Sequence, residues 1–257
     1  MINLQNITAL QQQFKNSQSF SQKDLYDFFT RSVKKKSEAD FLWYIYELKD
    51  KNIIKTIASD VYQLHHLKKT FAPFINDTLK SVSGILSKDF TLLNTCIWTT
   101  EWLNEFTIHQ SIRPYTFIEV EDSACESVFY HLRDKGFKNV FLKPDALLMN
   151  RYVSESDNPI VILKLLSRSP LMSLKIGNES AVTVPKLEKI LVDLYCDDIL
   201  FPAYKGHEQD QIFQRILKNY IVDFTTFFAY AERRKRKTFI MNYLHQHFTD
   251  IITEFKA

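Results

Sequence analysis

The stretch Val182-Thr-Val-Pro-Lys-Leu-Glu-Lys-Ile-Leu-Val-Asp-Leu-Tyr195 separates a region of mixed strands and helices from a region that is helical only. Pro185 suits a first helical turn, because its missing N–H would have no partner there. The apolar residues then recur at spacings of three and four and share one face: Leu187, Ile190, Leu191, Leu194 and Tyr195. Most charged residues fall on the other face: Lys186, Glu188, Lys189 and Asp193. The pattern predicts a helix with one buried stripe.

Length and composition limit the classes of protein. With 257 residues, 45% of them hydrophobic, the chain can bury a substantial core and form two domains. We expect a cytoplasmic protein, because no charged-then-apolar leader opens the sequence and no apolar run approaches the ~20 residues that cross a bilayer. Three scattered cysteines, Cys96, Cys125 and Cys196, are expected to be reduced, buried thiols. Only four glycines occur, which excludes a Gly-rich nucleotide loop.

The basic residues are concentrated near the N-terminus. Residues 1–70 hold 11 Lys and Arg against 7 Asp and Glu, whereas the remainder holds 22 against 23. The net charge of +3 therefore comes from the first quarter of the chain. A small basic domain joined to a neutral larger one is typical of a nucleic-acid reader attached to a sensing or partner-binding module.

The first 70 residues predict three helices and a hairpin. Apolar spacing indicates a first helix over residues 4–14, and Ser21 and Ser37 are the expected N-caps of the next two. Two alternating runs, 53–57 and 61–64, predict paired strands. This order is that of a winged helix-turn-helix, in which the third helix enters the major groove and the ribbon lies along the DNA backbone.

Candidate DNA contacts follow from this order. The basic residues before the third helix and at the ribbon are expected to bind phosphates: Lys34, Lys35, Lys36, Lys51 and Lys55. Tyr44 and Trp43 on the third helix are candidates for base contacts, or they pack in the core. The same helix carries carboxylates, which repel phosphates: Glu38, Asp40, Glu47 and Asp50. The alternative is a winged helix that serves only for packing or dimerisation.

Residues 71–184 alternate between helices and strands. A linker helix is expected over 71–88. Strands are predicted at 90–98, 115–120, 140–142 and 159–166, with helices beginning at Thr99, Cys125 and Asp145. The alternation implies an α/β layer with at least four strands.

Carboxylates within residues 71–184 suggest an alternative interpretation, that the protein is an enzyme. A restriction-type nuclease needs Pro-Asp followed by acid-x-Lys, and Pro144-Asp145 and Lys164 are present, but Ile162 occupies the acidic position. A nucleotidyltransferase needs Gly-Ser before an acid-x-acid pair, and Glu119-Val-Glu121 supplies the pair without the Gly-Ser. The simpler interpretation of Glu119 and Glu121 is a solvated strand edge. No histidine arrangement indicates catalysis.

Residues after Leu194 predict antiparallel helices, with apolar stripes within 211–220, 224–231 and 240–248. The run Arg233-Arg-Lys-Arg-Lys237 is either a solvated helix end, where cations suit the helix dipole, or a patch for nucleic acid or an acidic partner.

Three features together resemble antitoxins and transcriptional regulators of the AbiEi type, which belong to bacterial toxin–antitoxin pairs linked to phage abortive infection. These features are the winged-helix order, Leu187-Glu-Lys-Ile-Leu-Val-Asp193 after a short strand, and Tyr230-Ala-Glu-Arg-Arg234. The resemblance implies an N-terminal DNA reader that represses its own operon and a C-terminal domain that counteracts a nucleotidyltransferase toxin. Leu187, Asp193, Tyr230 and Arg234 match as fold-forming residues and not as a catalytic set. A relative that has lost its toxin would show the same pattern.

We therefore expect an α+β protein with a winged helix-turn-helix over 1–70, a linker helix over 71–88, and a mixed α/β domain with a C-terminal helical bundle over 89–257. The expected function is an antitoxin-like transcriptional regulator that binds operator DNA of its own operon and neutralises a nucleotidyltransferase toxin. We expect no enzymatic activity, no metal, no small-molecule cofactor and no membrane partner. The alternatives are a divergent nuclease or nucleotidyltransferase using Glu119, Glu121 and Asp145, and a pure protein-interaction module.

Overall fold

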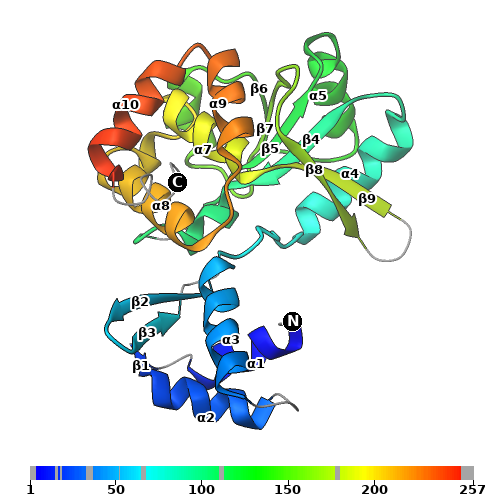
Figure 1. Ribbon diagram of the computed structural model, residues 1–257. Helices are drawn as coiled ribbons and strands as arrows, with labels where there is room; N and C mark the ends of the chain where they lie inside the picture. The colour runs from blue at the N-terminus through cyan, green and yellow to red at the C-terminus, as the bar shows by residue number, and fades with distance from the viewer. Residues whose placement is uncertain are drawn as a thin grey trace. The chain divides into compact units, whose positions relative to one another are not determined.

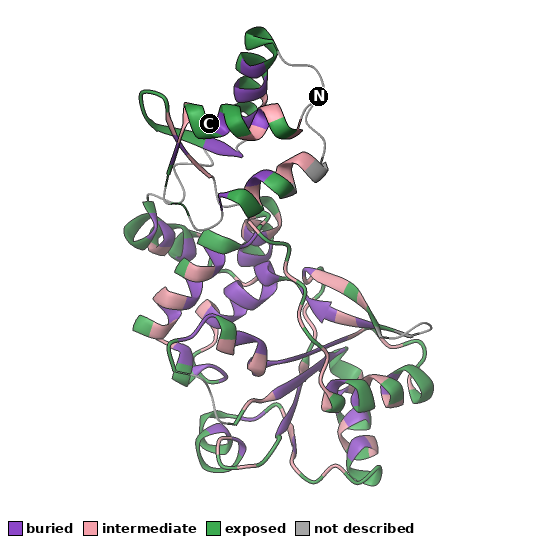
Figure 2. Ribbon diagram, turned by 90° about the horizontal axis from the view of Figure 1, so that it is seen from below, coloured by how far each residue is buried: buried purple, intermediate pink, exposed green. Residues whose placement is uncertain are grey.

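The structure is a computed structural model that describes residues 4–14, 17, 19–32, 37–51, 53–64, 68–109, 113–176 and 180–249. The chain is a mixed α+β protein that forms two compact units, Met1–Lys68 and Lys69–Ala257 (Figure 1). Each unit has its own apolar core. Figure 2 shows the buried residues concentrated on the inner faces of the helices and along the strands of the larger unit.

The smaller unit combines three helices with a three-stranded sheet. Its elements are α1 (Leu4–Gln13), β1 (Phe20–Ser21), α2 (Gln22–Ser32), α3 (Glu38–Asp50), β2 (Ile54–Ala58) and β3 (Val61–Leu64). The sheet is antiparallel with the order β1-β3-β2. The predicted helices and hairpin are confirmed, whereas the two-residue strand β1 was not predicted, because two residues carry no alternation.

Local capping explains where two helices of this unit begin. Ser37 Oγ accepts the backbone N–H of Asp40 at 3.1 Å, and the Asp40 carboxylate accepts the backbone N–H of Ser37 at 3.1 Å. Ser21 and Asp24 exchange the same pair of bonds at the start of α2. Each reciprocal pair satisfies two N–H groups that the helix itself leaves without partners. Both predicted N-caps are therefore confirmed.

The larger unit is built on a four-stranded sheet of order β4-β5-β7-β6. Its strands are β4 (Thr95–Thr99), β5 (Thr116–Val120), β6 (Val140–Leu142) and β7 (Ile160–Lys164). β5, β7 and β6 run parallel, and β4 is antiparallel to β5. Figure 1 shows α5 (Cys125–Asp134) and α7 (Leu187–Cys196) on opposite sides of this sheet. The inner strands are largely buried: β5 is buried along its whole length and β7 at Ile160, Val161 and Ile162, as in other sheets covered by helices on both sides.

Short helices connect the strands. They are η1 (Thr100–Glu105), η2 (Asp122–Ala124), α6 (Ala146–Leu148) and η3 (Met149–Val153). The helix expected as a linker over 71–88 is α4 (Asp77–Asp89), and it belongs to the larger unit, because Leu79, Val82 and Leu86 are buried in that core. This corrects the expectation of a separate linker helix.

A hairpin precedes α7, where the sequence indicated only a short strand. β8 (Leu171–Ile176) pairs with β9 (Ser180–Pro185), and Pro185 lies opposite Leu171 at the end of the ladder. Pro185 therefore ends a strand and does not start the helix, whose N-cap is Lys186. A terminal strand position tolerates proline, because the lost N–H costs no central ladder bond. The β-branched alternation of Val182 and Val184 outweighs the preference of proline for a first helical turn.

The C-terminal part is helical, as predicted. It comprises η4 (Pro202–Tyr204), α8 (His207–Asn219), α9 (Phe224–Arg233) and α10 (Lys237–His247). α9 packs against α7 and α10. Among the described residues, no helix has both the length and the apolar character that crossing a membrane requires.

Alanine substitutions at two glycines of the larger unit test the backbone conformations that the structure assigns to them. Gly84 lies in α4 with open space around an added Cβ, so Gly84→Ala should raise the free energy of unfolding by about 1 kcal/mol. Gly136 also has open space where a Cβ would lie, but its φ of +95° is costly for any residue with a Cβ. Gly136→Ala should therefore lower the free energy of unfolding by about 1 kcal/mol or more. Urea unfolding of both variants checks the signs, and changes of the same sign would contradict the assigned conformations.

Candidate functional site

The predicted DNA contacts in the smaller unit have different environments. Lys34, Lys35 and Lys36 lie outside the described residues. Lys55 is exposed on β2, and Lys51 forms an ion pair with Glu47 at 3.5 Å. Tyr44 is only 5% exposed and packs against Phe29, so its side chain is not available to a base. Of the two alternatives for Tyr44, the structure shows packing, and this corrects its place among the DNA contacts.

The exposed face of α3 carries an aromatic pair. Trp43 and Tyr46 are 60% and 58% exposed, and their rings stack with centroids 5.3 Å apart. Leu42, directly before Trp43 in the helix, is also exposed. Phe41, Ile45 and Leu48 take the buried side, and Tyr44 shares it. The outward surface of α3 is therefore apolar and aromatic at its centre, with carboxylates nearby.

The larger unit holds a buried ionic cluster between its sheet and its helices. Lys189 on α7 is 1% exposed, and its Nζ donates to Glu119 Oε1 on β5 and to Asp193 Oδ2 one helical turn away, each at 2.6 Å. Trp98 on β4 donates its indole N–H to the same Glu119 oxygen at 3.2 Å. The ammonium group thus connects α7 to β5, and Glu119 connects both to β4.

α9 supplies the remaining members of the cluster. The hydroxyl of Tyr230 donates to Asp193 Oδ1 at 2.9 Å, and Arg234 Nε lies 3.7 Å from the same oxygen. Asp193, Tyr230 and Arg234 were expected to be fold-forming residues, and the structure brings them together. Asp193 is 37 residues from Tyr230 in the chain, and the two meet because α7 packs against α9.

Burial and mutual attraction set the protonation of this cluster. Burial favours the neutral form of Lys189, but attraction to Asp193 and Glu119 outweighs it and holds the Lys189 pKa well above its ordinary value. Burial raises the pKa of the Glu119 carboxyl, and the Lys189 charge opposes that increase. Burial and the Asp193 charge raise the pKa of the Tyr230 hydroxyl. Tyr230 is therefore a hydrogen-bond donor at neutral pH.

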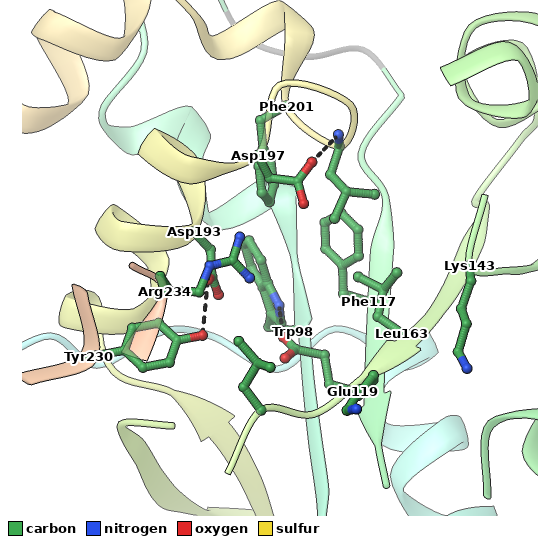
Figure 3. A pocket seen from close by; sticks show the side chains of 13 residues that line it. Trp98, Phe117, Glu119, Lys143, Leu163, Asp193, Asp197, Phe201, Tyr230 and Arg234 are labelled. Carbon is green, nitrogen blue, oxygen red and sulfur yellow. Dashed lines mark hydrogen bonds and ion pairs between the residues drawn. The ribbon is translucent and has the colours of Figure 1, made fainter. Parts of the chain in front are cut away.

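A pocket of about 290 Å³ opens beside this cluster (Figure 3). Its apolar lining comprises Trp98, Phe117, Leu163, Leu166, Leu200, Phe201 and the ring of Tyr230. Its charged lining comprises Glu119, Asp193, Asp197, Lys143, Lys164 and Arg234. Lys189 does not line it. Figure 3 shows Lys143 on the opposite side of the pocket from Arg234 and Tyr230.

The three carboxylates of the enzyme alternative do not form one metal site. Glu119 is committed to Lys189 and Trp98. Glu121 is exposed and accepts a bond from Asn94, and Asp145 accepts the backbone N–H of Leu148 as the N-cap of α6. In the parts of the chain that the structure describes, no three His, Cys, Asp or Glu side chains are placed to hold a metal ion. The interpretation of Glu119 as a solvated strand edge is wrong, because Glu119 is buried.

The basic run near the C-terminus does not form one surface. Arg233 contacts the Ser167 hydroxyl, and Arg236 lies over the ring of Phe239. Lys237 pairs with Glu232 at 3.6 Å, and Lys235 takes a positive φ after α9. Arg234 turns inward to Asp193 and the pocket. Arg234 therefore belongs to the cluster, and the other four residues lie at the end of α9 and the start of α10.

The sequence contained one indication of the cluster, a pair of opposite charges on α7, which hydrophobic periodicity does not take into account. α7 is buried around most of its circumference, including Glu188, Lys189 and Asp193, so the prediction of a single buried stripe is wrong. Lys189 and Asp193 are four residues apart, the spacing at which opposite charges pair on a helix. A buried lysine needs such partners. The third partner, Glu119, is 70 residues away and is not predictable from spacing.

Replacing Lys189 with an uncharged residue should show how strongly the buried carboxylates destabilise the fold when they have no cation. Lys189→Met is expected to lower the free energy of unfolding by about 3–5 kcal/mol at neutral pH, because Glu119 and Asp193 stay buried without their cation. In this variant the pKa of the buried Glu119 carboxyl is higher in the folded protein than in the unfolded chain, so the folded state binds more protons. The loss of stability should therefore shrink as the pH falls toward the ordinary carboxyl pKa of 4.5. Urea unfolding across this pH range measures both effects.

The control is Lys186→Met, which removes an exposed lysine at the start of the same helix. We expect this variant to stay within about 0.5 kcal/mol of the natural protein. A pH-independent loss in Lys189→Met, or an equal loss in both variants, would contradict the assigned ionic cluster.

Comparison with known proteins places the chain in a family. A search of curated proteins returns no match. A family model, described as a family of unknown function (DUF6577), matches residues 40–250. This match includes most of α3, the β2–β3 hairpin, and the strands and helices that supply the ionic cluster and the pocket. The chain therefore belongs to the DUF6577 family, a family of unknown function.

Proposed function

We propose that the protein is a DNA-binding transcriptional regulator whose smaller unit is a winged helix-turn-helix. The observation that carries the proposal is the order α1-β1-α2-α3-β2-β3 together with the sheet order β1-β3-β2. In this arrangement α3 follows α2 as a recognition helix, and the β2–β3 hairpin forms the wing. The DNA partner proposed is the operator of its own operon.

The surface of α3 supports a revised set of base contacts. A recognition helix reads bases with its outward side chains, and here these include Trp43 and Tyr46. Aromatic and apolar side chains contact the methyl group of thymine in the major groove. Trp43 and Tyr46 therefore replace Tyr44 as the residues proposed to meet base edges.

The charge distribution assigns the phosphate contacts mainly to one segment. The described residues of the smaller unit include six Lys and Arg against seven Asp and Glu. The basic surplus of this unit comes from Lys15, Lys34, Lys35 and Lys36. We propose that the Lys34–Lys36 run, directly before α3, provides most of the electrostatic attraction to DNA, with Lys51 and Lys55 as additional contacts.

Fluorescence anisotropy with a duplex from the region upstream of the gene tests this proposal. The natural protein should prefer this duplex to a shuffled one, and affinity should fall steeply as salt rises. Replacing Lys34, Lys35 and Lys36 with Gln should weaken binding and reduce the slope of log K against log salt by about one for each phosphate that the variant no longer neutralises.

The control is a variant that loses the same number of positive charges from the larger unit. Lys88, Lys138 and Lys175 are exposed lysines of the larger unit, and their replacement with Gln removes the same charge. This triple variant should bind DNA as the natural protein does. Equal affinity for the upstream and shuffled duplexes, or equal losses in the two triple variants, would overturn specific binding through the smaller unit.

The proposed second activity, neutralisation of a nucleotidyltransferase toxin by the larger unit, rests on the resemblance alone. The test is co-expression of the full chain with a nucleotidyltransferase encoded in the same operon. The proposal predicts that growth is restored, and that the Lys34–Lys36 variant restores it equally, because toxin binding is assigned to the other unit. Continued growth arrest with both chains folded would overturn this part.

A further inference from the structure

The pocket of the larger unit lies where sheets of this type bind ligands. Lys164 is the last residue of β7, Lys143 directly follows β6, and Glu119 is the second-last residue of β5. All three strands are parallel, so the pocket reaches their carboxyl ends. In open sheets of parallel strands, ligands bind outside these ends. The volume of about 290 Å³ is close to the lower end of the range for small-molecule sites.

The walls of the pocket suit a flat ring. Trp98 and Phe117 lie side by side on neighbouring strands with centroids 4.9 Å apart, and Phe201 lies 5.6 Å from Phe117. Leu163 and Leu166 add apolar surface. Aromatic and aliphatic side chains of this kind stack against a planar ring without requiring polar groups from it.

The buried end of the pocket provides hydrogen-bond acceptors. Glu119 lines the pocket, and its Oε1 takes both bonds from Lys189 and Trp98. Among the described residues, no hydrogen-bond partner is found for Glu119 Oε2. Glu119 lines the pocket, and a ligand N–H group is a suitable partner for a carboxylate oxygen there.

The opposite side of the pocket carries two lysine side chains. Lys143 and Lys164 share a single carboxylate, Asp122, at 2.6 and 3.5 Å. Both lysines are exposed at the mouth of the pocket, and Figure 3 shows Lys143 on the side away from Tyr230. The two ammonium groups share the paired carboxylate of Asp122 and keep N–H donors that can bind an anionic group.

We propose that this pocket binds a nucleotide, with the base against the aromatic wall formed by Trp98, Phe117 and Phe201, a base N–H donating to Glu119, and the phosphate at Lys143 and Lys164. Lysine side chains replace the glycine-rich loop that this sequence lacks, since lysine binds phosphate as a point charge. The ligand is bound and is not assigned any chemical change. This inference concerns the larger unit and is independent of DNA binding by the smaller one.

Isothermal titration calorimetry of the full chain tests the proposal with the four common nucleoside 5′-monophosphates. The comparison ligands are the matching nucleosides, inorganic phosphate and free tryptophan. At least one monophosphate should bind, and the matching nucleoside should bind more weakly. The Lys143→Gln/Lys164→Gln variant should lose about tenfold or more in affinity, because hydrogen bonds between charged groups contribute about that much.

Two further variants locate the ligand. Lys138→Gln/Lys175→Gln removes two exposed lysines that do not line the pocket and should bind as the natural protein does. Leu163→Trp fills the pocket without a change of charge and should abolish binding, with an unchanged circular dichroism spectrum showing that the chain is folded.

Four outcomes would overturn the proposal. They are no heat with any monophosphate, binding of inorganic phosphate as tight as that of the nucleotide, binding of tryptophan but of no nucleotide, and equal losses in the two double lysine variants. None of these outcomes bears on DNA binding, which is measured separately with the upstream duplex.

Discussion

The larger unit depends on the pairing of one buried ammonium group. Lys189 Nζ lies between Glu119 and Asp193, with almost no contact to solvent. Transfer of a charge from water into a protein interior costs several kcal/mol, and only close opposite charges with good hydrogen-bond geometry offset this cost. α7 cannot turn Lys189 toward water, because its neighbours around the helix are buried as well. The position of α7 on the sheet is therefore coupled to the position of Glu119.

The same cluster also determines the character of the pocket. Glu119 and Asp193 each bind Lys189 and also line the pocket, whereas Lys189 itself does not. The polar groups that hold the helix on the sheet are thus the groups that a ligand meets. Arg234 belongs to both as well, since it approaches Asp193 and forms part of the lining. A ligand in this pocket would therefore contact groups that join α7 to α9.

Features that depend on nearby residues were predictable from the sequence. The N-caps Ser21, Ser37 and Asp145 rest on bonds that span three residues, and each is confirmed. Gly136 follows the end of α5 with a positive φ, which glycine adopts more readily than other residues. The buried position of Tyr44 was available from spacing, because it lies three residues after Phe41 and four before Leu48.

Features that depend on distant partners were not predictable. Helix periodicity assigns charged residues to solvent, so Lys189 and Asp193 appeared exposed, although partners on β5 and α9 make their burial favourable. The pocket combines residues from strands and helices between Trp98 and Arg234, and no spacing in the sequence indicates that they meet. The β8–β9 hairpin was obscured because Pro185 suits either a strand end or a helix start.

A double-mutant cycle on Glu119 and Lys189 tests most directly whether this pair holds the larger unit together. The variants are Glu119→Gln, Lys189→Met and the two combined, each compared with the natural protein by urea unfolding at neutral pH. Because removal of one partner leaves the other charged group unpaired, the combined variant should be less destabilised than the sum of the single variants, by about 1–3 kcal/mol. Additive losses, within about 0.5 kcal/mol, would contradict the account.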